Sequence, residues 1–507
     1  MTKWKLAGST ALLLVMTSHG MLANVTPEDV WQSWQDGAAA MGQKVTAKSA
    51  ARAGDALVVT GVMIAMADAN GSTAAFDTIS FKDNGDGTVG IILPDSYPVT
   101  VIIPQKGSDT GQTDIIVNVT MPGATITASG TPQALSYKTD APELTIALGR
   151  VEPADGSKVD ASAEAKLTGL SATYLVEGAE SGKKISEDFA AKSFDLKIKG
   201  SDAKTKSDFN VTAAIADFGG KAAIDGMPNT TMTDLAAALK AGFAMDGSFS
   251  YGATTFNLDS TSDGKPTKIA GTVAGGDMAV AMDASQFKYA VGSKALQLTI
   301  NSPDIPIPDL TVGYGETAFN LTMPVTKSDT PSDFTLLTKI VDLKLSDAIW
   351  AMIDPTAALP HDPATLILDT KGKATLTKDL MQDAANVEAG TTGSAPPGMI
   401  NALDLTQLNV KAAGAELTGT GSFTFDNSDM TTFSGVPAPT GKIDLKAVGA
   451  NALIDKLVAM GLIPQDQAMQ GRMMISMFAN TDTTKDEMTS TLEFKDKHFF
   501  ANGQQLQ

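Results

Sequence analysis

The chain of 507 residues has no cysteine, only three histidines and few aromatic residues, which make up 6% of it. Without cysteine, neither a disulfide nor the lipid anchor of a bacterial lipoprotein can form. The shortage of aromatic residues predicts a shallow core built from small aliphatic side chains. Beyond the first residues, no stretch approaches the ~20 apolar residues that a transmembrane helix needs, so no integral membrane segment is expected.

Residues 1–23 have the composition of an export signal. Lys3 and Lys5 supply a positive start, residues 6–16 (LAGSTALLLVM) supply a short apolar core, and Ala23 is a small residue at the exit. Because this core is too short to span a bilayer, it predicts a cleaved signal and not a membrane anchor. We expect cleavage after Ala23 and export as a soluble protein to the periplasm of a Gram-negative bacterium.

Charge and motifs exclude several classes of function. The formal net charge of −19 repels nucleic acid and anionic lipid headgroups. The sequence has neither a G-x-S-x-G nor an H-E-x-x-H motif, and the prolines around His361 (LPHDP) predict an exposed turn histidine. We therefore predict no enzymatic activity, no catalytic residue and no cofactor.

Two segments have some features of metal sites. In residues 82–90 (KDNGDGTVG), Lys82 and Leu93 would take the first and last ligand positions of a calcium loop, where acidic side chains are needed. Its Asn-Gly and Asp-Gly pairs are instead typical of a hairpin turn. Residues 468–478 (AMQGRMMISMF) contain four methionines that could bind Cu(I), but no histidine or cysteine lies nearby. Packing or the lining of an apolar surface is favoured for these methionines, and no metal is predicted.

Most of the remaining sequence alternates between apolar and polar residues. In residues 193–200 (SFDLKIKG), Phe194, Leu196 and Ile198 share one face of an extended chain. The same period recurs in residues 114–121, 143–149, 295–301, 318–323 and 441–448. Such alternation is typical of antiparallel strands with one buried and one solvated face. The predicted fold is mainly β (α+β), with an extended, curled antiparallel sheet and a few short covering helices.

Residues 23–35 (ANVTPEDVWQSWQ) predict an aromatic helix at the start of the mature chain. Thr26 is a suitable N-cap, Pro27 suits the first helical position, and Val25 and Val30 have the spacing of a hydrophobic staple. An apolar stripe lies opposite a polar one: Trp31, Trp34, Ala38 and Met41 against Gln32, Gln35 and Asp36. We expect this helix to bury its apolar stripe.

Three further short helices are predicted at residues 231–242, 346–355 and 451–461, each followed by strand-like sequence. They indicate an internal repeat of a helix followed by strands. Residues 24–387 are expected to form a β-rich body that begins with the aromatic helix and contains such modules. Residues 388–399 (EAGTTGSAPPGM) have the composition of a linker. A C-terminal β/α portion, residues 400–507, is expected to continue the same sheet.

Two segments carry a resemblance to a known family. Residues 345–376 (LSDAIWAMIDPTAALPHDPATLILDTKGKATL), together with VTPEDVWQSWQ at 25–35, resemble the secreted bacterial proteins classed as domain of unknown function 2125. The tail at 490–507 (STLEFKDKHFFANGQQLQ) resembles the ends of another uncharacterised periplasmic family and, more distantly, of AsmA-type envelope proteins. The first family implies no activity and no functional residues. AsmA-type proteins usually have an N-terminal membrane anchor, which is not expected here.

The excess of one-faced strands over helices suggests a function. So few helices cannot cover all the predicted strands, so the sheet must curl and either close on a dry core or leave an apolar groove. The candidate residues that plug or line such a groove are Trp31, Trp34, Met41, Trp350, Met473 and Met477. The leading hypothesis is a periplasmic protein that binds or shields a hydrophobic ligand, such as a lipid or an acyl chain. The alternative is a structural or scaffolding protein of the envelope with a dry core and no ligand.

Overall fold

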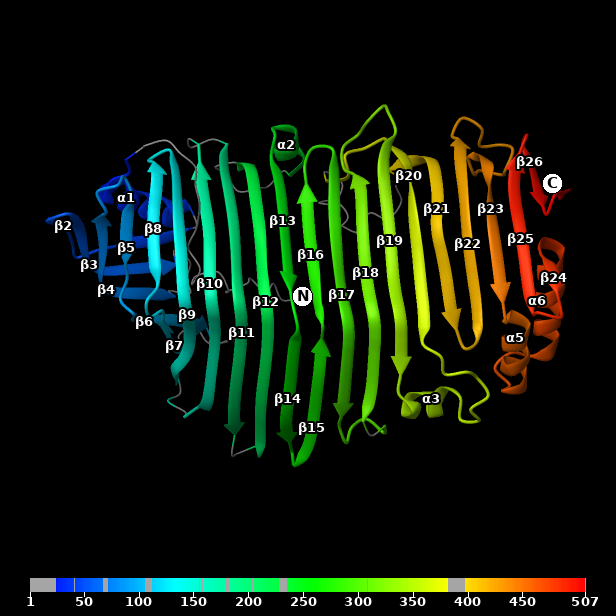
Figure 1. Ribbon diagram of the computed structural model, residues 1–507, viewed down its shortest axis with the longest axis horizontal. Helices are drawn as coiled ribbons and strands as arrows, with labels where there is room; N and C mark the ends of the chain where they lie inside the picture. The colour runs from blue at the N-terminus through cyan, green and yellow to red at the C-terminus, as the bar shows by residue number, and fades with distance from the viewer. Residues whose placement is uncertain are drawn as a thin grey trace. The chain divides into compact units, whose positions relative to one another are not determined.

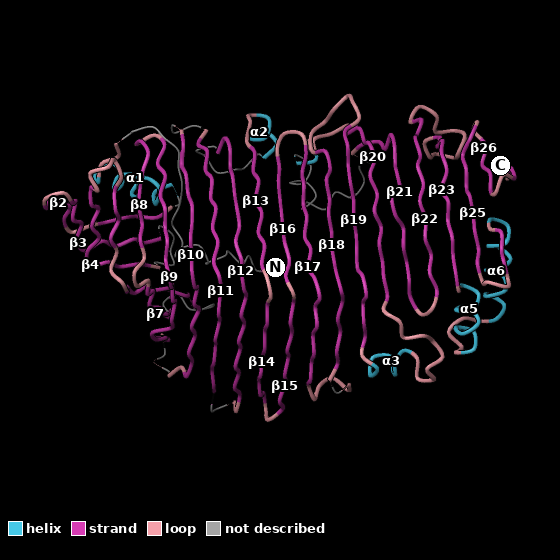
Figure 2. The backbone as a smooth tube through the Cα atoms, in the orientation of Figure 1, coloured by secondary structure: helices cyan, strands magenta, loops and turns pink. Residues whose placement is uncertain are grey.

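The computed structural model describes residues 24–40, 42–66, 72–104, 112–154, 156, 158–178, 182–202, 205–227, 235–307, 309–381 and 397–506. The expected signal with its cleavage after Ala23, Met41, and most of the expected linker at 388–399 lie outside these residues. The chain divides into two compact units: unit 1 is Met1–Thr230 with Asp246–Ala270, and unit 2 is Thr231–Met245 with Gly271–Gln507. Strands predominate in each unit and helices are short, which confirms the predicted mainly β fold (Figures 1 and 2).

Unit 1 begins with a helix and continues almost entirely in antiparallel strands. Its elements are α1 (Pro27–Ala40), β1 (Gln43–Thr46), β2 (Ser49–Ala53), β3 (Ala56–Met66), β4 (Thr73–Asp83), β5 (Val89–Ile92), β6 (Ser96–Pro104), β7 (Gln112–Thr120), β8 (Thr125–Thr131), β9 (Ala134–Pro153), β10 (Asp160–Glu177), β11 (Lys183–Asp202), β12 (Ser207–Met227) and β14 (Thr254–Ser262). Two more strands, β13 (Ala244–Tyr251) and β15 (Lys265–Val273), have residues in both units.

Helix α1 begins where the sequence predicts. The backbone N–H of Asp29 donates to Thr26 Oγ1 at 3.2 Å, and the N–H of Thr26 donates to Asp29 Oδ2 at 2.9 Å. This reciprocal pair satisfies two backbone donors at the helix start, as a capping box does. Glu28, the second residue of α1, forms a 2.6 Å ion pair with Arg52 of β2, which connects the first turn to the sheet.

The sheet of unit 1 bends at two interrupted strands. Both β5 and β6 pair with β4, so β5 and β6 together form one long strand with a break. In the same way β7 and β8 both pair with β9 and form a second interrupted strand. The breaks contain Pro94 and Pro122, which lack the N–H that a ladder needs. The backbone N–H of Met121 donates to the carbonyl of Asp95 at 2.8 Å, which places the two breaks side by side. In Figure 1, β3 and β4 accordingly run crosswise to β9 and β10.

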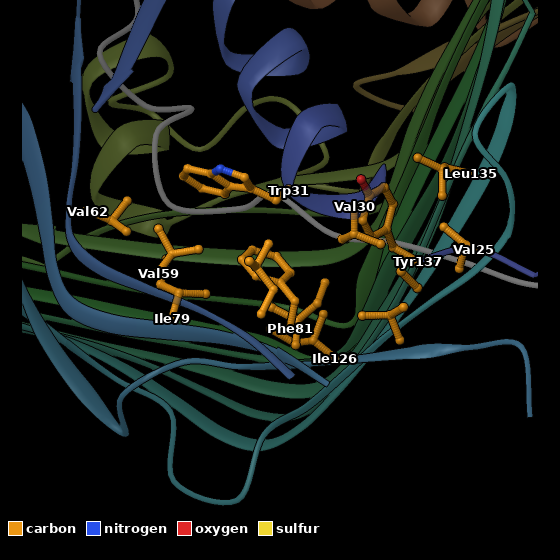
Figure 3. Close-up of a cluster of buried hydrophobic side chains, with 14 of the residues drawn as sticks. Val25, Val30, Trp31, Val59, Val62, Ile79, Phe81, Ile126, Leu135 and Tyr137 are labelled. Atoms are coloured by element: carbon orange, nitrogen blue, oxygen red, sulfur yellow. The ribbon is translucent and has the colours of Figure 1, made fainter. Parts of the chain in front are cut away.

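This bend encloses the core of unit 1. Val59, Ile79 and Phe81 from β3 and β4 have no exposed surface, and α1 inserts Val30 and Trp31 among them (Figure 3). Side chains from β5, β8 and β9 complete this cluster. A second buried cluster joins β7 to β9, β10 and β11. The predicted curl therefore closes on itself in unit 1, with α1 inside the bend.

Unit 2 consists of long strands with short helices in the connections. Its elements are α2 (Leu235–Lys240), β16 (Gly275–Met282), β17 (Gln286–Asn301), β18 (Leu310–Pro324), β19 (Ser332–Leu345), α3 (Asp347–Ile353), β20 (Ala364–Leu376), β21 (Gly398–Ala412), β22 (Ala415–Asp426), β23 (Ala438–Val448), α5 (Ala450–Ala459), α6 (Gln465–Phe478), β24 (Asn480–Asp482), β25 (Glu487–Lys495), β26 (His498–Ala501) and β27 (Gln504–Gln505).

The strands of unit 2 form a simple antiparallel meander. From β16 to β23 each strand pairs with the next, and β23 then pairs with β25. Strands β20 and β21 flank the expected linker and pair from Thr365↔Lys411 to Leu376↔Gly398, so both belong to one sheet. Helices α2, α3 and α5 coincide with the three predicted helical segments, α5 beginning one residue earlier than predicted, whereas α6 was not predicted. Among the described residues, no helix is both long and apolar enough to cross a membrane.

Candidate functional site

The most extensive chemical feature of unit 2 is an apolar surface that crosses its sheet. Residues that lie directly opposite in antiparallel strands point to the same side, so the strand register defines this surface. One row across it is Tyr289, Leu321, Leu336, Thr370, Leu405, Gly421, Ile443 and Leu492. A parallel row is Val291, Phe319, Thr338, Leu368, Leu408, Gly419, Leu445 and Ser490. We call the side of the sheet that bears these two rows the open face.

The opposite side of the same sheet is polar. The row that alternates with the first apolar row is Lys288, Thr322, Thr335, Lys371, Asp404, Ser422, Lys442 and Glu493. Ion pairs stabilise this side, among them Lys373 with Asp333 at 2.7 Å. Charge is thus confined to one side of the strands, and the two apolar rows contain no ionisable carboxyl, amine or guanidinium group.

The open face remains accessible in the structure. None of the apolar side chains in its two rows is fully buried, and Phe319 is 36% exposed. The fully buried apolar residues of unit 2, such as Leu239, Ile307 and Val325, lie outside these rows. Helix α3 connects strand ends, while α6 packs beside β25 (Figure 1). At the β25 end α6 does cover this face, because Ser490 is buried and donates to the Phe478 carbonyl at 2.6 Å. Among the other described strands of unit 2, no second layer buries the two rows.

A cleft of about 500 Å³ lies elsewhere in unit 2, between α5, α6 and β25. Six of its nine lining residues are polar or charged, and the guanidinium of Arg472 donates to Asp455 Oδ1 at 2.6 Å and to the carbonyl of Asn451 at 3.1 Å. This cleft is therefore not the apolar groove that the sequence predicts, and the apolar surface is the open sheet face.

The two tryptophans of α1 differ in burial. Trp31 is 9% exposed and lies 5.7 Å from the ring of Phe81, whereas Trp34 is only half-buried and meets the same ring edge-on at 5.4 Å. Burial raises the pKa of Tyr137 in this core to about 12, and its hydroxyl donates to Ser33 of α1 at 2.9 Å. Within unit 1 the helix is a packed core element. Met41, expected on the same stripe, lies outside the described residues.

Trp350 of α3 packs against the loop that follows its own helix. Its ring stacks on His361 with centroids 4.3 Å apart, which ties α3 to the following loop. Asp354 closes this loop by accepting hydrogen bonds from the backbone N–H of Leu359 at 2.6 Å and from the Thr356 hydroxyl at 3.1 Å. The backbone bond from Leu359 holds the pKa of Asp354 below its ordinary value. The Trp350 segment thus stabilises the connection between β19 and β20.

Met473 and Met477 do not line an apolar interior, contrary to expectation. They are 66% and 61% exposed on α6. The helix packs on β25 through its other side, where Ala468 is buried. A stripe of apolar residues in sequence can belong to either side of a helix, and the buried residue of α6 is Ala468.

The segment at 82–90 is a hairpin turn, as predicted. Strands β4 and β5 pair up to Asp83↔Val89, and the turn between them contains Gly85 and Gly87 at φ 78° and 87°. Asp86 Oδ1 accepts a hydrogen bond from the Thr88 N–H at 3.0 Å and is therefore occupied within the turn.

A family model described as an uncharacterized protein conserved in bacteria, DUF2125, matches residues 209–501. The chain belongs to this family. The match confirms the resemblance carried by the Trp350 segment and includes every residue of the open face. No curated protein and no solved structure matches the chain. The resemblance to AsmA-type proteins stays a prediction.

Proposed function

We propose that this DUF2125 member is a non-catalytic periplasmic protein that binds the hydrocarbon chain of a lipid on the open face of unit 2. The observation that carries this proposal is the separation of the two sides of one sheet: apolar rows on one, charged rows on the other. Apolar surface left in water costs free energy, and a sheet of this kind is normally covered. A bound chain would cover it.

The size of the open face suits a hydrocarbon chain. Adjacent strands are about 4.8 Å apart, so the eight strands from β17 to β25 in the apolar rows span roughly 34 Å. The chains of one membrane leaflet extend about 15 Å, half of a bilayer's hydrocarbon core. Each buried methylene contributes about 0.8 kcal/mol. A chain of ~12 carbons shielded on one side would therefore gain roughly 5 kcal/mol.

The alternative is a scaffolding role in which another protein covers the open face, because large exposed apolar patches also mark protein interfaces. Protein interfaces usually contain about one hydrogen bond per 100–200 Å². The two rows contain few polar side chains, and the hydroxyls of Thr370 and Ser490 already donate to the carbonyls of Leu336 and Phe478. A hydrocarbon chain needs no directional partner, so the composition of the rows favours a lipid.

Two neighbouring residues on β20 provide a matched test. Leu368 lies on the open face between Thr338 and Leu408, whereas Ile367 lies on the polar side between Lys339 and Asn409. We expect Leu368→Asn to weaken binding of the apolar dye N-phenyl-1-naphthylamine at least ~5-fold, since a polar amide would interrupt the row. Ile367→Asn should leave the affinity unchanged.

Organic extraction of the protein purified from the periplasm, followed by mass spectrometry, identifies any co-purifying lipid. Thermal melting of both variants checks that each is folded. Wild-type protein that neither carries lipid nor binds the dye would overturn the proposal and favour the scaffolding role. Equal loss of dye binding in both folded variants would place the bound chain away from the open face.

A further inference from the structure

Glu187 of β11 is an acidic side chain on the apolar side of the unit 1 sheet. It lies opposite Tyr174 of β10 and Ala222 of β12, in a row that continues to the buried Tyr137 of β9. Its neighbour Asp188 points to the other side and forms a 2.6 Å ion pair with Lys221. No hydrogen bond or ion pair joins the Glu187 carboxylate to a side chain of any residue that the structure describes.

An aromatic cluster lies on the same side of β11 as this carboxyl group. Phe189, two residues further along the same side of β11, lies 6.4 Å from both Phe218 and Phe249. Its ring covers Gly220, where an added Cβ would come within 2.9 Å of it. Phe189, Phe218 and Phe249 are all half-buried, so their side chains remain partly accessible.

Among the residues of unit 1 that the structure describes, no cationic side chain pairs with Glu187. Glu187 has two cross-strand neighbours, Tyr174 and Ala222, and of these Tyr174 is titratable. Burial raises the pKa of Glu187, and burial together with the charge of Glu187 raises the pKa of Tyr174. A half-buried carboxylate without a partner is costly, and a cation brought by a ligand would offset that cost.

We propose that Glu187 and the Phe189 cluster bind the ammonium head of an amphiphile whose hydrophobic part lies on the neighbouring apolar residues of unit 1. The carboxylate would accept charge-assisted hydrogen bonds from the ammonium group. The aromatic ring beside it would add a cation–π contact. An anionic head would be repelled, and an alcohol would gain only a neutral hydrogen bond. The net charge of −19 favours cations in the same way.

This site extends the proposed lipid binding to a class of head group, but it lies in unit 1 and can be tested separately. Dodecylammonium, dodecanol and dodecanoate share one hydrocarbon chain and differ in the head group. We expect wild-type protein to bind dodecylammonium most tightly, and Glu187→Gln to weaken this binding ~10-fold or more while leaving dodecanol unaffected. Asp188→Asn, on the other side of the same strand, is the control and should change neither affinity.

Two further measurements keep the proposal falsifiable. In wild-type protein, the affinity for dodecylammonium should fall as the pH drops through the raised pKa of Glu187, and in Glu187→Gln it should not. The affinities for lysophosphatidylethanolamine, which has an ammonium group, and lysophosphatidylglycerol, which has none, show whether the natural amine belongs to a lipid headgroup. Tighter binding of the first lipid supports a headgroup as the source, and equal affinities support a simple alkylamine. Equal affinities for the three dodecyl compounds, unchanged by Glu187→Gln, would overturn this proposal and leave the open face of unit 2 intact as a lipid site. Dodecanol binding that is lost in Leu368→Asn but kept in Glu187→Gln would report on the open face of unit 2 and not on the Glu187 site.

Discussion

Phe81 and Phe319 both lie on the apolar side of an antiparallel sheet, but they differ in burial. Phe81 in unit 1 has no exposed surface, whereas Phe319 in unit 2 is 36% exposed. Both units follow the same principle of alternating strands, so alternation alone does not determine whether an apolar face is covered. Whether an apolar face is covered depends instead on where its strands are interrupted.

Unit 1 closes because two of its long strands are broken. The breaks at Pro94 and Pro122 lie side by side and let the sheet bend, and α1 then fills the bend. Strands of unit 2 contain only single residues with positive φ, such as Ala295 at 52° and Asp342 at 55°. A bulge of this kind bends a strand locally without ending its ladder. The sheet of unit 2 therefore continues as one layer.

The largest predicted effect tests this comparison directly. Phe81→Ala should lower the free energy of unfolding by ~3–5 kcal/mol, the usual cost of removing a buried aromatic side chain. Phe319→Ala should cost only about 1 kcal/mol, because much of its surface already contacts water. Chemical denaturation of both variants, with hydrogen exchange to assign the change to a unit, measures the difference. Equal losses would mean that Phe319 is covered in solution.

A smaller effect is expected within α1. Trp31→Ala should destabilise unit 1 more than Trp34→Ala, because Trp31 is buried and Trp34 only half-buried, with losses of ~3–5 and roughly 1–3 kcal/mol. Gln32→Ala, at an exposed position on the same helix, should stay within about 0.5 kcal/mol. Thermal melting ranks the three variants. A Trp34→Ala protein that melts below Trp31→Ala would contradict the packing of this helix.

The sequence predicts the strands and helix α1 but not the closure of one unit and the openness of the other. Both predictions depend on local sequence. Alternation places Phe194 and Leu196 on the same side of a strand, independently of what packs against it. Helix capping depends on residues within one turn, such as Thr26. Coverage depends on pairings between distant residues, such as Tyr289↔Leu321, which a single sequence does not specify. For the same reason the sequence does not predict the open face. The candidate residues chosen from the sequence lie elsewhere: Trp31 is packed in the core of unit 1, and Met473 and Met477 face the solvent.

The smallest effect concerns the loop that connects β19 and β20 at the end of the open face strands. Asp354 accepts the Leu359 backbone hydrogen bond, which lowers its pKa below the ordinary value of 3.8, so its ionised form stabilises the folded loop. Asp354→Asn should lower the Tm by roughly 2–4 °C at pH 7. That difference should persist above pH 3.8 and shrink as the pH falls further, because the wild-type carboxylate is then protonated. Asp362→Asn, at an exposed position in the same loop, serves as the control and should melt like wild type at every pH. A Tm difference for Asp354→Asn that is independent of pH would show that the carboxylate charge does not stabilise this connection.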